Sequence, residues 1–132
     1  KALQTLAETA MDFPTSKIFP GIPEYFNADG RGMYHYLTGA ASWYMLTVIT
    51  QAFGVRGEGG DLVIEPKLVR EQFDSNGEAA IDFSFAGKQF RAVIVNPAGK
   101  DFGEYRAAGT VLSREAISAL PERGNIIRVE LT

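Results

Sequence analysis

Residues 30–43 contain the side chains and backbone positions best suited to chemistry. Thr38 and Gly39 directly precede a long apolar run that predicts a helix. A helix start presents free backbone amides and the positive end of the helix dipole, so it can bind an anion; Gly39 would allow close approach and Thr38 would add a hydroxyl. The alternative is that Thr38 only caps the helix, and on spacing alone we favour this common role.

Two charged or titratable side chains lie in the same stretch. Arg31 lies in a glycine-rich turn, residues 29–32, that could present its guanidinium to a carboxylate or phosphate. His35, between Tyr34 and Tyr36, could act as an acid or base or donate to a sugar hydroxyl. A solvated arginine and a packed histidine ring are the commoner roles of such residues, and both alternatives stay open.

Aromatic and acidic residues suggest carbohydrate chemistry without defining a site. Trp43 and the tyrosines, Tyr34 among them, could form a platform for a sugar ring, although a tryptophan on a buried helix is more often core. A glycosidase needs two carboxylates at a defined separation, and the spacing nominates no pair. We expect Glu58 and Asp61 to be solvated in a glycine-rich turn. The candidate carboxylates are Glu24, Glu58, Asp61 and Glu65.

The composition argues against several classes of partner. The chain has 132 residues, a formal net charge of −3 and no basic run, so we expect neither nucleic acid nor anionic membrane as a partner. With no cysteine and one histidine, thiolate chemistry and a histidine-rich metal site are not expected. No signal peptide is visible, and the longest apolar run is shorter than the ~20 residues of a membrane-spanning helix. Because a helical pattern is already under way at Lys1, we expect a piece of a longer polypeptide.

Helical periodicity characterises the start of the chain. Apolar residues at spacings of three and four predict an amphipathic helix that ends near Met11, and Pro14 forbids its continuation. Prolines, glycines and aromatic rings in residues 12–32 predict a long ordered loop.

A second, more apolar helix is predicted over residues 40–53. Gly54 lies where a left-handed helix cap belongs. Since the run is apolar nearly all round, we expect this helix, and Trp43 with it, to be buried among other helices of the parent molecule.

Beyond a glycine-rich turn at residues 57–60, the apolar period changes from about 3.6 residues to 2, which indicates β-strands. Residues 86–88 predict a hairpin connection, and Ser113 begins a helical turn. Short strands with regular turn signals are typical of an antiparallel β-sandwich or jelly roll. We place the domain boundary between residues 54 and 55. The predicted strands cover residues 62–64, 80–85, 90–95, 105–112 and 126–131.

Five motifs resemble the C-terminal end of glycoside hydrolase family 94. This family includes cellobiose, chitobiose, cellodextrin and 1,2-β-oligoglucan phosphorylases and a region of cyclic β-1,2-glucan synthases. The sequences of residues 23–27 and 30–32 look closest to those of the 1,2-β-oligoglucan enzymes. The resemblance implies an α+β fragment, in which residues 1–54 are the terminal helices of an (α/α)6 barrel and residues 55–132 are a jelly-roll-like antiparallel β-sandwich. The motifs are FPGIPEYFN (19–27), GRGMY (30–34), YLTGAASW (36–43), FGVR (53–56) and GDLVIEPK (60–67).

The resemblance also implies a phosphate site. In the family, the threonine and the following glycine amide of the YLTGAASW-like motif help to hold inorganic phosphate, and here these are Thr38 and Gly39. Ala40 replaces the usual serine, so any contact from that hydroxyl is missing. Because this assignment coincides with the helix-start argument, we now favour a phosphate site. Arg31, Tyr34 and His35 are weaker candidates for substrate contact, and His35 is not the family's phosphate-binding histidine, which lies upstream together with an arginine.

The reaction implied is inverting phosphorolysis of a β-glucosidic bond to α-glucose 1-phosphate, with phosphate as co-substrate and no cofactor or metal. The catalytic aspartate would lie upstream of Lys1, so we expect no catalysis by this chain alone. The expected partners are a β-gluco-oligosaccharide, phosphate and the rest of the parent polypeptide, with a homodimer as one possible assembly, in the bacterial cytoplasm.

Two alternatives to a phosphorylase remain. The chain could be a carbohydrate-binding module whose sandwich carries an aromatic patch of Phe83, Phe85 and Phe90. Alternatively, residues 55–132 could serve a purely structural role. Phosphate binding that depends on Thr38 would favour the phosphorylase, and glycan binding independent of Thr38 would favour the module.

Overall fold

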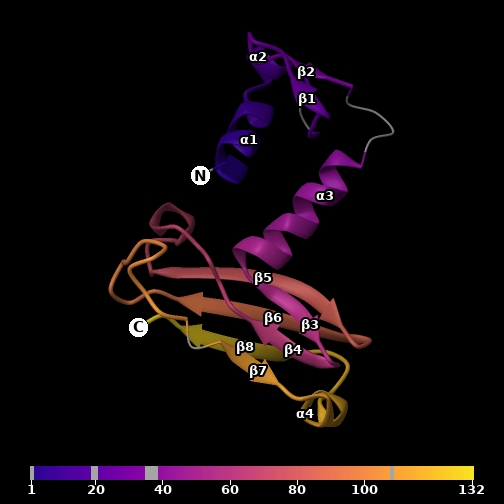
Figure 1. Cartoon of the computed structure of the whole chain (residues 1–132), viewed down its shortest axis with the longest axis vertical. Coiled ribbons are helices and arrows are strands. Elements are labelled where there is room, and N and C mark those ends of the chain that lie inside the picture. Colours follow the sequence, from indigo (N-terminus) through magenta and orange to yellow (C-terminus); the bar gives the residue numbers. More distant parts are fainter. Residues whose placement is uncertain (1, 19–20, 35–38, 108) are drawn as a thin grey trace. The chain divides into compact units, whose positions relative to one another are not determined.

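The computed structural model describes residues 2–18, 21–34, 39–107 and 109–132. The chain divides into two compact units, Lys1–Val48 and Ile49–Thr132, each with its own helices and strands (Figure 1). The boundary expected from the sequence lies a little later, after residue 54. No helix of the described residues is long and apolar enough to cross a membrane.

The first unit begins with helix α1 (Ala2–Met11), which confirms the predicted helix and its end. Pro14 does not lead directly into a loop, because a short helix α2 (Phe13–Ser16) includes it in its first turn. Proline is tolerated there, since the first amides of a helix have no intrahelical partner. The buried Ser16 hydroxyl donates to the carbonyl of Ala10 at 2.9 Å and joins the two helices.

The expected loop over residues 12–32 therefore contains regular structure. Besides α2, it includes strand β1 (Tyr25–Phe26), which pairs antiparallel with β2 (Gly32–Met33). The ladder was not predicted, because two-residue strands are too short to show a period of 2.

Helix α3 (Ala40–Thr47) is exposed in this chain, whereas the sequence predicts its burial among other helices of a parent molecule. None of its residues is buried, and Trp43 is 68% exposed. The Tyr44 hydroxyl donates to the carbonyl of Leu3 at 3.2 Å, which links α3 to α1. A helix that is apolar all round cannot be covered by one short helix, so its apolar side chains remain in solvent in this chain.

Beyond α3 the helix widens and then ends. Val48–Ala52 form a π-helical turn, η1, instead of continuing the predicted α-helix to residue 53. Gly54 then adopts the left-handed conformation, with φ of 69°, as predicted.

The second unit contains two three-stranded sheets, of order β3-β4-β7 and β5-β6-β8 (Figure 1). The β5–β6 hairpin turns through Ala86 and Gly87, both with positive φ, as a two-residue type I′ turn requires. A 3-10 turn η2 (Arg70–Gln72) and helix α4 (Arg114–Ala119) complete the unit. The strands are β3 (Val55–Glu58), β4 (Asp61–Ile64), β5 (Glu78–Phe85), β6 (Lys88–Val95), β7 (Thr110–Leu112) and β8 (Asn125–Glu130).

Three details differ from the predicted antiparallel sandwich. Strand β8 pairs parallel with β6, because β7 and α4 intervene between them and return the chain in the same direction. The strand predicted over residues 105–112 is reduced to β7. Strand β3 was not predicted, since the glycines at 57–60 were interpreted as a turn alone. The described part of this unit is thus a small α+β domain with antiparallel pairing in both sheets and one parallel pair.

One hydrophobic core includes residues from both sheets and from α4. The rings of Phe83 and Phe90 stack within it, with centroids 5.6 Å apart, and Phe85 packs against it. Of the aromatic patch expected from these three residues, Phe83 and Phe90 are therefore internal, and Phe85 is partly buried. The largest fully buried side chains of this core are Leu62, Ile64, Leu68, Ile94, Ile117 and Leu131.

Candidate phosphate site at the start of helix α3

Three of the five predicted site residues, Arg31, Tyr34 and Gly39, are described by the structure, and all three lie in the first unit. His35 and Thr38 lie outside the described residues. Among the residues that are described, no hydrogen bond or ion pair links Arg31 or Tyr34 to Gly39.

Arg31 lies in the loop between β1 and β2, which a single asparagine organises. The Asn27 Oδ1 atom accepts from the amides of Asp29 at 3.0 Å and Arg31 at 2.9 Å. The Asn27 amide donates to the Arg31 carbonyl at 2.9 Å, and Gly30 has a φ of 81°. The backbone of Arg31 is thus well held while its side chain is exposed. This is the presentation that recognition of an anion would need.

Tyr34 lies beside β2 in a left-handed conformation, with φ of 52°, which is uncommon for an aromatic residue. Its carbonyl accepts from the Glu24 amide at 3.0 Å, which holds this backbone in place. Its ring centroid is 5.8 Å from that of Tyr25, and both rings are exposed. The sequence analysis did not single out Tyr25, because only the β1–β2 pairing brings it near Tyr34.

Gly39 is the N-cap of α3, so the helix begins one residue later than the expected cap at Thr38. Its carbonyl accepts from the Trp43 amide at 2.8 Å. Its φ of −79° is accessible to any residue, so the backbone conformation does not require glycine. A Cβ at this position would lie 3.1 Å from Trp43 Cδ1, which is a close contact. The missing side chain keeps the helix start accessible.

The first turn of α3 can interact with an anion through its backbone. The amides of Ala41 and Ser42 precede the first intrahelical hydrogen bond and have no acceptor within the helix. No acidic residue lies in this turn to compete for them. The helix dipole adds partial positive charge, so an anion is the favoured ligand of this end.

Three of the four carboxylates considered for catalysis, Glu58, Asp61 and Glu65, have structural partners. Arg56 pairs with Glu58 at 2.5 Å and with Glu65 at 2.9 Å. The hydrogen bonds that Arg56 donates to Glu58 and then to Glu65 raise the pKa of Arg56 above its ordinary value. Asp61 Oδ1 accepts from the Arg114 amide at 2.9 Å. The sequence had suggested that Glu58 and Asp61 are solvated. In the structure, both carboxylates also accept hydrogen bonds from other residues.

The described residues contain no group of three or more histidine, cysteine, aspartate or glutamate side chains that could hold a metal ion. No protein-family model matches the chain, and the search of curated proteins found no match. The resemblance to glycoside hydrolase family 94 is therefore supported by the sequence motifs and not by these comparisons.

Proposed function

We propose that this chain is the C-terminal part of an inverting β-glucoside phosphorylase of glycoside hydrolase family 94, and that it contributes Thr38 and the amides around Gly39 to the phosphate site. One observation carries the proposal. The glycine of the YLTGAASW motif is the N-cap of an exposed helix, where backbone amides face outward. The family motif and the physics of a helix start therefore select the same position.

Under this proposal the first unit is a remnant of the (α/α)6 barrel. Three large apolar side chains of α3 support this, since Trp43, Met45 and Leu46 are exposed by 68%, 58% and 48%. Neighbouring barrel helices would cover them. Contiguous apolar surface on a helix is typical of a region that another part of a protein packs on.

The second unit would be the jelly-roll-like β-sandwich that follows the barrel. Two three-stranded sheets that share one core support a sandwich. The parallel β6–β8 pair departs from a purely antiparallel jelly roll. For this half of the chain we propose a structural role.

The proposed reaction uses phosphate as the nucleophile. A catalytic aspartate of the parent polypeptide protonates the leaving oxygen, and phosphate attacks the anomeric carbon from the opposite face. The amides at the start of α3 orient the phosphate and offset its charge, which lowers the barrier without covalent chemistry by this chain. Since it lacks the acid, the isolated chain turns over no substrate.

The proposed reaction needs no cofactor and would take place in the bacterial cytoplasm. Arg31, Tyr34 and His35 stay candidates for contact with the substrate.

Phosphate titration of the ¹⁵N-labelled chain tests the site directly. We expect saturable amide shifts at residues 39–42 and a loss of affinity in Thr38→Val of roughly tenfold, the value of one hydrogen bond to a charged group. Thr47→Val is the matched control, because the Thr47 hydroxyl donates within the same helix to the Trp43 carbonyl at 2.7 Å. Equal affinities of the two variants, or no saturable shift at residues 39–42, would contradict the proposed site.

The alternative of a carbohydrate-binding sandwich loses its original support. Phe83 and Phe90 are buried and stack on each other, so they offer no platform. A glycan site on this unit would have to use other residues.

A further inference from the structure

The second unit contains a hollow of about 320 Å³ that none of the roles above uses. It lies between two turns, residues 74–77 and 96–99, close to the 3-10 turn η2. Both turns belong to the same unit, so their relative placement is part of one fold. The side chains that matter for its chemistry are Arg70, Phe73, Asp74, Ser75, Asn76 and Pro97.

The first wall of the hollow is held by its own hydrogen bonds. Asp74 Oδ1 accepts from the amides of Asn76 and Glu78, each at 2.8 Å. The Glu78 amide, followed by Asn76, holds the pKa of Asp74 below its ordinary value, so the carboxylate is charged at neutral pH. The Asn96 amide donates to the Gly77 carbonyl at 2.8 Å and ties this wall to the other.

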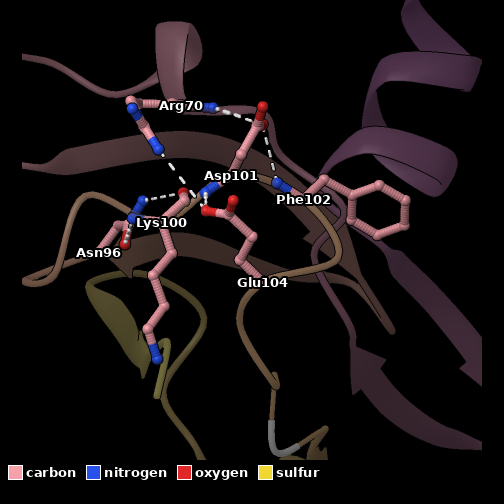
Figure 2. Close-up of polar contacts among 6 residues, drawn as sticks. All are labelled: Arg70, Asn96, Lys100, Asp101, Phe102 and Glu104. Atoms are coloured by element: carbon pink, nitrogen blue, oxygen red, sulfur yellow. Dashed lines mark hydrogen bonds and ion pairs between the residues drawn. The ribbon is translucent and has the colours of Figure 1, made fainter.

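The second wall is equally well defined. The side chain of Asn96, which is 3% exposed, donates to the Lys100 carbonyl at 2.9 Å and accepts from the Lys100 amide at 3.0 Å. This clamp fixes the turn that carries Pro97, and Figure 2 shows it beside the loop that follows.

Arg70 is positioned by the same loop (Figure 2). Its amide donates to Asp101 Oδ1 at 3.2 Å, and its guanidinium lies 3.5 Å from Glu104 Oε2. Glu104 Oε2 in turn accepts from the Asp101 amide at 2.9 Å. The ion pair is exposed and contributes little to stability, but the contacts orient the guanidinium at the rim.

The chemistry of the lining selects a neutral polar ligand. Arg70 already lies beside Glu104, and Asp74 Oδ1 already accepts from two backbone amides, so neither charge is left free to select an anion or a metal ion. Ser75 and Asn76 add hydroxyl and amide groups that can both donate and accept. Phe73, which packs against the core, and Pro97 add apolar surface.

We infer that this hollow binds one sugar unit of a neutral saccharide. A pyranose ring combines hydroxyl groups, which match paired donors and acceptors, with a C–H face that suits aromatic and proline surfaces. The rigid walls reduce the entropy cost of binding, since the groups are already in place. For a hexose-sized ligand we expect a Kd of about 1 mM.

The inference stands on the hollow and does not need the phosphorylase. Only the identity of the saccharide as a β-glucan rests on the proposed function. In that case the hollow would bind one glucose unit of the polymer independently of the phosphate site.

The test is a titration of the ¹⁵N-labelled chain with cellobiose, the β-1,2-linked disaccharide sophorose and maltose. We expect saturable amide shifts confined to residues 70–77 and 96–99. Arg70→Gln and Ser75→Ala each weaken binding by roughly fivefold, the value of one lost hydrogen bond. Ser118→Ala is the control, because Ser118 lies on α4 and does not line this hollow.

Absence of saturable shifts in these segments, or equal affinities of the three variants, would overturn the inference. Neither Arg70 nor Ser75 supports the core, so unchanged melting temperatures will separate lost binding from lost folding. Equal affinity for maltose and sophorose would support the hollow while removing its link to a β-glucan. Phosphate shifts at residues 39–42 report on the other site, so the two proposals fail independently.

Discussion

Gly54 is the residue whose backbone most strictly requires glycine. It has a φ of 69°, and a Cβ would lie 1.8 Å from the Glu65 carbonyl oxygen. Its own carbonyl accepts from the Glu65 amide at 3.1 Å, and this hydrogen bond holds the backbone of Gly54 close to that of Glu65. A side chain here would have to break this contact as well as adopt an unfavourable conformation.

We therefore predict that Gly54→Ala lowers the free energy of unfolding by roughly 2–4 kcal/mol. Gly59→Ala is the matched control, because Gly59 also has a positive φ of 60° but nothing within 4 Å of its Cβ position. Gly59→Ala should lower the free energy of unfolding only by the cost of the left-handed conformation, about 1 kcal/mol. Urea unfolding of both variants checks this, and losses of equal size would contradict the steric explanation.

Tyr105 is a buried phenol with one hydrogen bond. Its hydroxyl donates to the Leu68 carbonyl at 2.8 Å, and burial raises its pKa above the ordinary value of 10.0. The folded chain therefore holds the phenol proton more tightly than the unfolded chain does. The resulting stability is fully present below about pH 10 and is lost as the pH rises through the raised pKa.

We predict that Tyr105→Phe costs about 1–2 kcal/mol near pH 7, because the buried Leu68 carbonyl loses its partner. The difference from the unmodified chain should shrink as the pH rises above the ordinary tyrosine value. Denaturant unfolding at several pH values measures it, with Tyr34→Phe, at an exposed ring, as the control. A difference that stays constant with pH would show that the phenol does not titrate as described.

At the scale of elements, α3 differs from every other apolar segment of the described chain. Its hydrophobic composition resembles a core, yet Trp43, Met45 and Leu46 are exposed. Under the proposed function, these side chains become buried only in the parent polypeptide. The same helix would then have two different environments.

Trp43 reports on this difference because it is the chain's single tryptophan. We predict solvent-like emission and free quenching by acrylamide in the dilute isolated chain, and blue-shifted, protected emission in the parent polypeptide. A protected indole in the dilute isolated chain would contradict the exposed α3. Emission unchanged in the parent would contradict its burial among barrel helices.

Elements with local signals could be predicted from the sequence. Apolar spacing located α1, the alternation around residues 80–95 located the β5–β6 hairpin, and Gly54 marked a left-handed cap. The parallel partner of β6 could not be predicted, because the orientation of β8 depends on the path through β7 and α4. Ala86 likewise has a φ of 49° that its identity does not suggest.

In the candidate site, too, only the features with a local signal could be predicted. Gly39 could be selected from its place before an apolar run, whereas the pairing of Tyr25 with Tyr34 depends on a ladder of two-residue strands. The hollow beside Arg70 was not recognised in the sequence, since its walls come from two turns about twenty residues apart. Its signals were the DSNG and NPAG turn sequences, which alone indicate only turns.

At the scale of the whole molecule, the two units have different proposed roles. The first carries the exposed helix start and its apolar flank, and the second carries a complete hydrophobic core and a separate hollow. The first unit would therefore complete an active site together with the parent polypeptide, while the second folds around its own core. Under the proposed function, the joined protein is a phosphorylase that uses Thr38 and Gly39 to bind phosphate.

The most direct test is product analysis with the parent polypeptide, a β-1,2-gluco-oligosaccharide and inorganic phosphate. We predict release of α-glucose 1-phosphate, and a KM for phosphate that rises roughly tenfold or more in Thr38→Val while the KM for the oligosaccharide changes little. The isolated 132 residues should release none. Release of free glucose without phosphate consumption, or an unchanged phosphate KM in Thr38→Val, would contradict the account.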